Sequence, residues 1–128
     1  MSYYFAKTID KGFDEAIIII TESLANEGFG IISEIDVTAT FKKKLDVDFK
    51  KYRILGACSP SHAYKALIAE DKIGTMLPCN VIVQEVNDGQ TEIAAIDPMA
   101  SMMSVQNEAL GDVALDVRTK LKKVIDSL

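Results

Sequence analysis

The spacing of apolar residues changes its period several times along this chain, and the order of these periods most constrains the fold. Apolar and polar side chains alternate over residues 3–9 and 29–37, which is the pattern of half-buried strands. Between them, residues 13–25 carry apolar side chains at helical spacing, and Gly28 suits the left-handed end of that helix. The first third of the chain therefore predicts a strand, a helix and a second strand.

The remaining segments continue this alternation and end in a hairpin. We expect a short helix near residues 38–45 with Thr38 as its N-cap, and then a mostly apolar strand over 52–58. Ser59 and Pro60 are suited to the N-cap and first position of the next helix, because proline has no backbone N–H to leave unpaired there. A further helix is therefore expected after the third strand.

The last segments are a strand pair and a long helix. Asn87-Asp88-Gly89 is a tight-turn signal that predicts an antiparallel hairpin of strands 79–86 and 91–96, followed by an amphipathic helix over residues 110–128. The complete order is β-α-β-(α)-β-α-β-β-α. It predicts one domain over residues 1–128 of the α+β class, a two-layer α/β sandwich with a mixed sheet of about five strands.

The charge and hydropathy of the chain bear on its partners. The net charge is −5, which argues against a nucleic-acid surface, because phosphate binding needs a basic one. Residues 42–53 hold six basic residues against two acidic ones, a local excess that we interpret as a solvated face. The chain shows no signal-peptide pattern and no apolar run long enough to span a membrane. We therefore expect a cytoplasmic protein with reduced thiols, binding neither nucleic acid nor membranes.

Three segments together resemble a known family. They read Tyr-Arg-Ile-Leu-Gly-Ala-Cys-Ser-Pro over residues 52–60, Gly-Thr-Met-Leu-Pro-Cys-Asn-Val over 74–81 and Ala-Ile-Asp-Pro-Met over 95–99. The chain resembles the domain-of-unknown-function family 302 over nearly its whole length. The resemblance implies a two-layer α/β fold that is often dimeric, and it implies no established activity. Ser59 stands where the family usually has asparagine, so a side-chain amide donor is lost there.

The two cysteines indicate where a site would lie. Cys58 ends a strand directly before a helix N-terminus, where free N–H groups favour a thiolate, and Cys79 begins another strand. If these strands are antiparallel neighbours, both sulfur atoms share one pocket. The other candidates follow these two in sequence or should reach the same end of the sheet. The predicted ligand-binding residues are Cys58, Ser59, His62, Cys79, Asn80, Asp97 and Met99.

Each candidate also has a purely structural interpretation. Free cysteines are often core residues, and Met99, Met102 and Met103 have the spacing of core or interface filler. His62 fits a surface position in a first helical turn, and Asp97 before a proline fits a residue that binds turn amides. The sequence by itself leaves these interpretations open.

Three functions follow from these patterns. The first is a homodimeric binding module whose cysteine-lined pocket takes a small ligand or a soft metal ion, since thiolate and thioether groups suit Cu(I) and Cys with His suits zinc. The second is a thiol-dependent enzyme or redox protein using Cys58, which is less favoured because no known catalytic motif occurs. The third is a protein–protein interaction domain, suggested by Ile18, Ile19 and the methionines. No catalytic residue, cofactor or metal is assigned.

Overall fold

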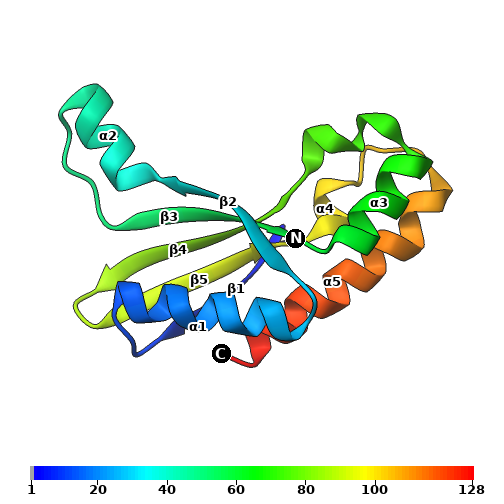
Figure 1. Ribbon diagram of the computed structural model, residues 1–128. Coiled ribbons are helices and arrows are strands. Elements are labelled where there is room, and N and C mark those ends of the chain that lie inside the picture. Colours follow the sequence, from blue (N-terminus) through cyan, green and yellow to red (C-terminus); the bar gives the residue numbers. More distant parts are fainter. Residues whose placement is uncertain (1) are drawn as a thin grey trace.

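The segments with a period of two form one sheet in the computed structural model, which describes residues 2–128 (Figure 1). The order of the strands across the sheet is β1-β5-β4-β3-β2. The predicted α+β class, the five strands and the order of the main elements are confirmed. The strands are β1 (Tyr4–Ile9), β2 (Gly30–Asp36), β3 (Tyr52–Cys58), β4 (Cys79–Asn87) and β5 (Gln90–Ile96).

Every neighbouring pair of strands is antiparallel, where a mixed sheet was expected. A strand–helix–strand unit sets the relative direction of its two strands but does not make them neighbours. β1 and β2 do run in the same direction, yet they form opposite edges with three strands between them. β3 and β4 run in opposite directions because the helical segment between them leaves and returns at one end of the sheet.

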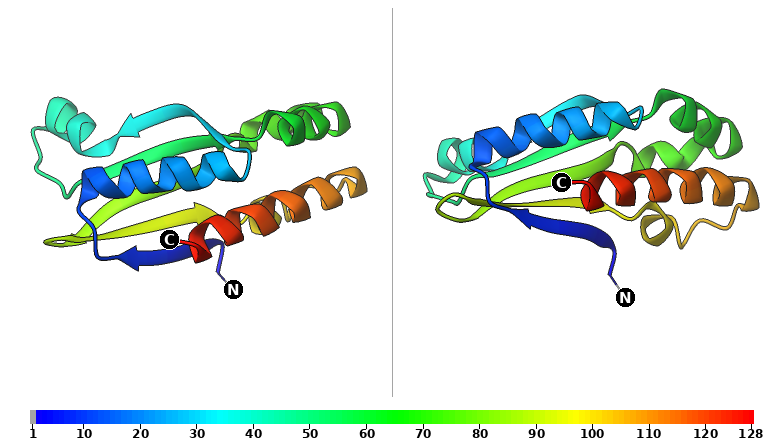
Figure 2. Two further views of the ribbon diagram at one scale, coloured as in Figure 1. Left: turned by 60° about the horizontal axis from the view of Figure 1, so that its bottom comes forward. Right: turned by 90° about the horizontal axis from the view of Figure 1, so that it is seen from below.

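The helices are placed on one face and at the ends of the sheet. α1 and α5 lie side by side across one face (Figure 2), and each contacts β5. α3 and the 3-10 helix η1 extend beyond the end where β3 stops and β4 starts. The helical elements are α1 (Phe13–Asn26), α2 (Val37–Leu45), α3 (Pro60–Ala69), η1 (Asp71–Met76), α4 (Pro98–Ser101), η2 (Glu108–Leu110) and α5 (Gly111–Asp126).

The main core lies between this helical layer and the sheet. Ile20 and Leu24 of α1 and Leu121 of α5 are fully buried against the inward-facing residues of the strands, such as Val81 and Ile93. A second, smaller cluster of buried residues around Ala66, Ile73 and Leu110 joins α3, η1 and η2. The space between these two clusters is the region in which the candidate site lies.

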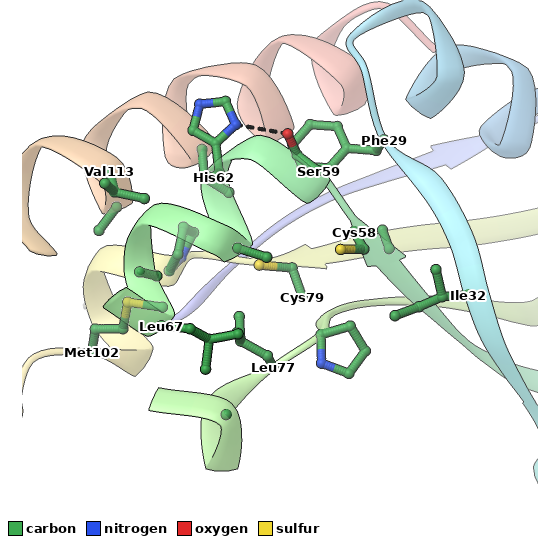
Figure 3. Close-up of a pocket in the computed structure, with 18 residues that line it drawn as sticks. Phe29, Ile32, Cys58, Ser59, His62, Leu67, Leu77, Cys79, Met102 and Val113 are labelled. Atoms are coloured by element: carbon green, nitrogen blue, oxygen red, sulfur yellow. Dashed lines mark hydrogen bonds between the residues drawn. The ribbon is translucent and has the colours of Figure 1, made fainter. Parts of the chain in front are cut away.

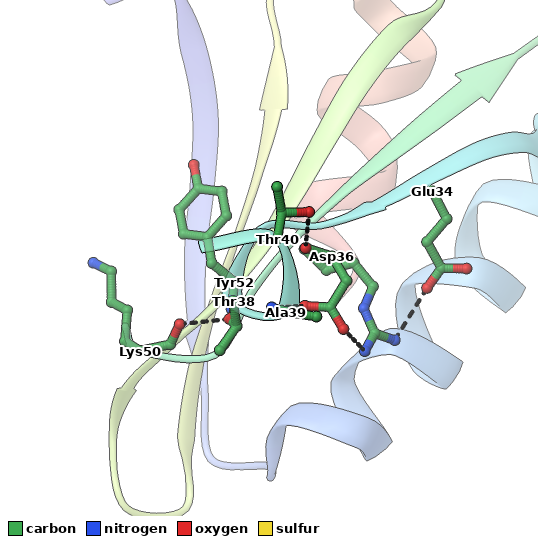
Figure 4. Close-up of polar contacts among 8 residues, drawn as sticks. Glu34, Asp36, Thr38, Ala39, Thr40, Lys50 and Tyr52 are labelled. Atoms are coloured by element: carbon green, nitrogen blue, oxygen red, sulfur yellow. Dashed lines mark hydrogen bonds and ion pairs between the residues drawn. The ribbon is translucent and has the colours of Figure 1, made fainter. Parts of the chain in front are cut away.

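The β2–β3 ribbon carries α2 away from the body of the molecule (Figure 1), and no residue of α2 is buried. Thr38 was the expected N-cap of this helix, but the cap is Asp36, whose carboxylate accepts from Ala39 N–H (Figure 4). The Thr38 hydroxyl instead donates to Lys50 O at 2.7 Å and accepts from Tyr52 N–H at 2.9 Å. Thr38 therefore ties the returning chain to α2 rather than starting the helix.

Within residues 2–128, no helix packs along the second face of the sheet (Figure 2). Side chains alternate along each strand, so this open face carries one half of the strand residues, including Tyr52, Ile82 and Ala94. Together with Tyr3 and Tyr4 these residues line a shallow hollow. Asn80, Gln84 and Glu92 line the same hollow, so the open face combines apolar and polar side chains.

Candidate functional site

An apolar pocket opens at the end of the sheet where β3 leads into α3 and η1 leads into β4 (Figure 3). Its volume is about 310 Å³. Its wall also includes residues from α4, α5 and the start of β2, so it draws on segments from most of the chain. We call it the thiol pocket; its lining includes Phe29, Ile32, Cys58, Ser59, His62, Ala63, Leu67, Leu77, Pro78, Cys79, Met102 and Val113.

The pocket exists because small residues face each other where the helices meet the sheet. Large side chains at these positions would fill the space, as they do in the main core. The wall is made almost entirely of carbon and sulfur atoms, and the polar side chains among the described residues that line it are those of Ser59 and His62. The small lining residues are Ala57, Ala63, Ala66, Gly74 and Ala114.

The register of β3 and β4 brings the two cysteines to this pocket. Ala57 pairs with Cys79, and Cys58 follows Ala57 at the end of β3. Both cysteines are free thiols; Cys79 is buried and Cys58 is partly exposed. Burial, and next the nearby Cys58, raises the pKa of Cys79 to about 11. Cys79 is therefore a neutral, apolar group at neutral pH.

A chain of three hydrogen-bonded polar side chains starts at the pocket wall. It consists of Ser59, His62 and Asp116. Ser59 Oγ lies 2.7 Å from His62 Nδ1 (Figure 3), and His62 Nε2 is hydrogen-bonded to Asp116 Oδ2 on α5. The hydrogen bond to His62 is the main cause that lowers the pKa of Asp116, and the charge of Lys120 acts in the same direction. An ionised Asp116 only accepts hydrogen bonds, so the tautomer of His62 that fits this contact carries its proton on Nε2.

The structure brings four of the seven predicted site residues to the thiol pocket and places three elsewhere. Cys58, Ser59, His62 and Cys79 line it. Asn80 lines the hollow on the open face of the sheet, because side chains of consecutive strand residues point to opposite faces. The remaining two, Asp97 and Met99, follow β5.

Asp97 and Met99 lie near the same end of the sheet but outside the wall of the thiol pocket. Asp97 is buried; it caps α4 by accepting from Met99 N–H at 3.0 Å and pairs with Arg118 Nε at 3.2 Å. The Met99 side chain is 41% exposed, and Met102, one turn later, lines the pocket in its place. Asp97 thus has structural partners within the chain.

Sequence reasoning missed Asp116 and the apolar side of the wall. Asp116 is 54 residues after His62 and sits in a helix whose other charged residues give the same sequence signal. Phe29 precedes β2 and Ile32 lies near its start. The alternation of apolar and polar residues in this strand gives no indication of a pocket. The packing of α5 beside α3 brings Asp116 to His62, and the pairing of β2 with β3 brings Phe29 and Ile32 to the pocket.

Neither a metal-binding cluster nor a membrane-spanning helix is present in the part of the chain that the structure describes. Within residues 2–128, no three side chains of His, Cys, Asp or Glu are grouped so that they could hold a metal ion. Over the same range, no helix has both the length and the apolar character needed to cross a bilayer.

Comparison with known proteins identifies relatives of the same fold. A family model described as "Domain of unknown function DUF302" matches residues 5–128. The crystal structure of an uncharacterized conserved DUF302 protein from Bacillus stearothermophilus is similar over 98% of each chain, with a TM-score of 0.89 and 28% sequence identity. No curated protein matches the sequence.

Proposed function

The chain belongs to the DUF302 family, whose function is unknown, and from its own residues we propose that it is a binding module that takes a small, mainly apolar organic molecule in the thiol pocket. The observation that carries this proposal is the pocket itself, an opening of about 310 Å³ whose wall is apolar except at Ser59 and His62. Ligand pockets in proteins typically combine a mostly apolar wall with a few polar groups that orient the ligand.

The chemistry of the two thiols favours an organic ligand over a metal ion. A soft metal ion needs thiolate ligands, and metal binding would have to remove the proton of Cys79, whose pKa is about 11. Two cysteines and the thioether of Met102 are the sulfur groups in the wall. The neutral Cys79 thiol and the Met102 thioether are polarizable groups that make favourable contacts with aromatic rings. Ring-shaped molecules are therefore among the small, mainly apolar ligands that the pocket would take.

A titration with indole, an uncharged ring molecule, tests this proposal. The ¹³C-methyl signal of Met102 should shift with a saturable dependence on indole concentration, while that of Met103, which is 73% exposed, should stay in place. Ala63→Leu places a larger side chain in the wall and should abolish the shift. Its matched control is Tyr64→Leu at the next position, where the side chain is 68% exposed.

The outcome that would contradict the binding proposal is a wild-type protein in which indole leaves Met102 unshifted or shifts Met103 equally. Circular dichroism of Ala63→Leu and Tyr64→Leu would establish that both variants keep the native fold. A lost shift in a folded Ala63→Leu and a retained shift in Tyr64→Leu would assign the binding to this pocket.

The proposal includes a homodimer that buries the open face of the sheet. Tyr52, Ile82 and Ala94 face outward in adjacent strands, beside Tyr4, which is 44% exposed. Apolar side chains of this kind, bordered here by the polar Gln84 and Glu92, suit a partner surface, and a two-fold axis would let the same patch cover itself. Unpaired thiols on both cysteines fit the reducing cytoplasm as the place where this dimer works.

Light scattering during size-exclusion chromatography tests the dimer. The wild type should have twice the mass of one chain, and Ile82→Lys should have the mass of one chain. Ile18→Lys is the matched control, because Ile18 is 59% exposed on α1, in the layer that covers the other face of the sheet. A dimer lost in Ile18→Lys but kept in Ile82→Lys, or a monomeric wild type, would overturn the interface.

A further inference from the structure

The Ser59–His62–Asp116 chain has the proton arrangement of a general-base relay. Asp116 accepts from His62 Nε2, which leaves the lone pair of Nδ1 to accept the hydroxyl proton of Ser59 at 2.7 Å. The same order of carboxylate, imidazole and hydroxyl activates the nucleophile of serine hydrolases, with the two ring nitrogens exchanged. His62 has only 13% of its side chain exposed, which holds the ring in place between its partners.

The Ser59 side chain does not cap α3, although Ser59 is at the N-cap position of that helix. A serine at a helix N-cap usually accepts from the backbone N–H of the second or third helical residue. Ser59 makes no such side-chain bond, and the first intrahelical bond at this end joins Ala63 N–H to Ser59 O at 3.0 Å. The N–H groups of Ser61 and His62 therefore have no acceptor within the helix. They are open donors at the end of α3 where Ser59 lies, and a negative oxygen formed near that end would need such donors.

The relay stands at the wall of a pocket that suits an acyl chain. Ser59 and His62 are the polar members of the wall, and Figure 3 shows them together at one edge of the residues that line it. Cys58, Cys79 and Leu67 form part of the apolar remainder. Asp116 has 53% of its side chain exposed, so the relay ends at the solvent. An ester could therefore place its apolar acyl group in the pocket and its alcohol toward water.

We infer that Ser59 is the nucleophile of an esterase that acts on small esters with a short apolar acyl group, with His62 as general base and Asp116 as its orienting carboxylate. The inference rests on the proposed function, since the thiol pocket must admit the acyl group.

The reaction balances with water as the only co-reactant. Ser59 Oγ attacks the ester carbonyl carbon, and its proton passes to His62 Nδ1. The bond to the alcohol oxygen then breaks, and the departing alcohol takes that proton, leaving the acyl group on Ser59. Water attacks the acyl-serine, gives a proton to His62, and releases the carboxylic acid as Ser59 regains its proton.

Hydrolysis of p-nitrophenyl butyrate, together with labelling by a fluorophosphonate, tests the inference on the full chain. Ser59→Ala should lower kcat/KM by about a hundredfold or more, because it removes the nucleophile, and Asp116→Asn by about tenfold or more. The fluorophosphonate should modify Ser59, as located by peptide mass spectrometry. The matched controls are Ser104→Ala and Asp112→Asn, which replace exposed residues outside the relay and should retain wild-type kcat/KM.

The indole titration of Met102 separates failure of this inference from failure of the binding proposal. Wild-type protein that binds indole but leaves Ser59 unlabelled, or hydrolyses the ester as fast after Ser59→Ala, would overturn the esterase and leave the pocket as a binding site. Hydrolysis that survives Ser59→Ala and disappears in Cys58→Ser would also overturn it, in favour of a thiol nucleophile. Ser59→Ala that still binds indole but has lost hydrolysis would support both proposals.

Discussion

Ala57 in β3 is paired directly with Cys79 in β4. The antiparallel register therefore sets the end of one strand beside the start of the next, and Cys58, the residue after Ala57, lines the same pocket as Cys79. The two thiols differ in environment, because Cys79 is buried and Cys58 is partly exposed.

Iodoacetamide should modify Cys58 well before Cys79. The pKa of Cys79 is raised from 9.0 to about 11, so its thiolate fraction at neutral pH falls roughly a hundredfold below that of an ordinary thiol. Peptide mass spectrometry at intervals after addition measures both rates. The rate at Cys79 should keep rising with pH until about pH 11, and a plateau near pH 9 would contradict the assigned burial.

Gly56→Ala should destabilise the fold, whereas Gly30→Ala should not. A Cβ atom at Gly56 would lie 2.1 Å from Ser33 Oγ and 2.7 Å from Pro78 Cγ, and the proline ring cannot rotate away. Overpacking of this kind typically lowers the free energy of unfolding by about 1–3 kcal/mol. At Gly30 nothing lies within 4 Å of the added atom. Alanine there reduces the conformational freedom of the unfolded chain, so the free energy of unfolding should rise by a few tenths of a kcal/mol or more.

Urea unfolding of the two glycine variants checks this prediction. Both glycines lie in paired strands. Changes of opposite sign in the free energy of unfolding would therefore assign the loss to the close contact at Gly56. Equal unfolding midpoints for Gly56→Ala and Gly30→Ala would show that β3 shifts to make room for the methyl group.

Asp97→Ala should lower the free energy of unfolding by roughly 2 kcal/mol, from the lost helix cap and the unpaired partner. The carboxylate accepts from Met99 N–H and pairs with Arg118, whose guanidinium also lies over the Phe5 ring. Asp112→Ala, an exposed change in the first turn of α5, should cost little and serves as the control. If Asp97→Ala kept wild-type stability but weakened indole binding, the residue would belong to the ligand site after all.

Asp116 should stabilise the fold near neutral pH and lose this effect in acid. Its folded-state pKa lies below the ordinary value of 3.8, chiefly because of the hydrogen bond to His62, so the unfolded chain binds the proton more readily. The contribution is therefore complete above pH 3.8 and disappears as the pH falls through the lower folded-state value. The difference in urea midpoint between wild type and Asp116→Asn should shrink from about pH 5 to about pH 2.5. A difference that grows over this range would contradict the assignment.

Much of the fold follows from local signals. Gly28 has the positive φ expected at the end of α1, and Gly89 has a positive φ in the β4–β5 turn. The amphipathic stripe predicts which residues of α1 are buried, and Ile20 and Leu24 are fully covered. Thr38 shows the limit of such signals, because Asp36, two residues earlier, also carries an oxygen that can cap a helix and is the residue that does so.

For the candidate site, the sequence by itself determined that Cys58 precedes a helix, that Cys79 starts a strand and that His62 lies one turn after Ser59, because these are relations between near neighbours in the chain. Only the tertiary structure decided that β3 and β4 are paired, that Asn80 faces away, and that Asp116 reaches His62 from α5. The physical reason is that periodicity specifies which side of an element is apolar, whereas the register between elements depends on packing across the whole core.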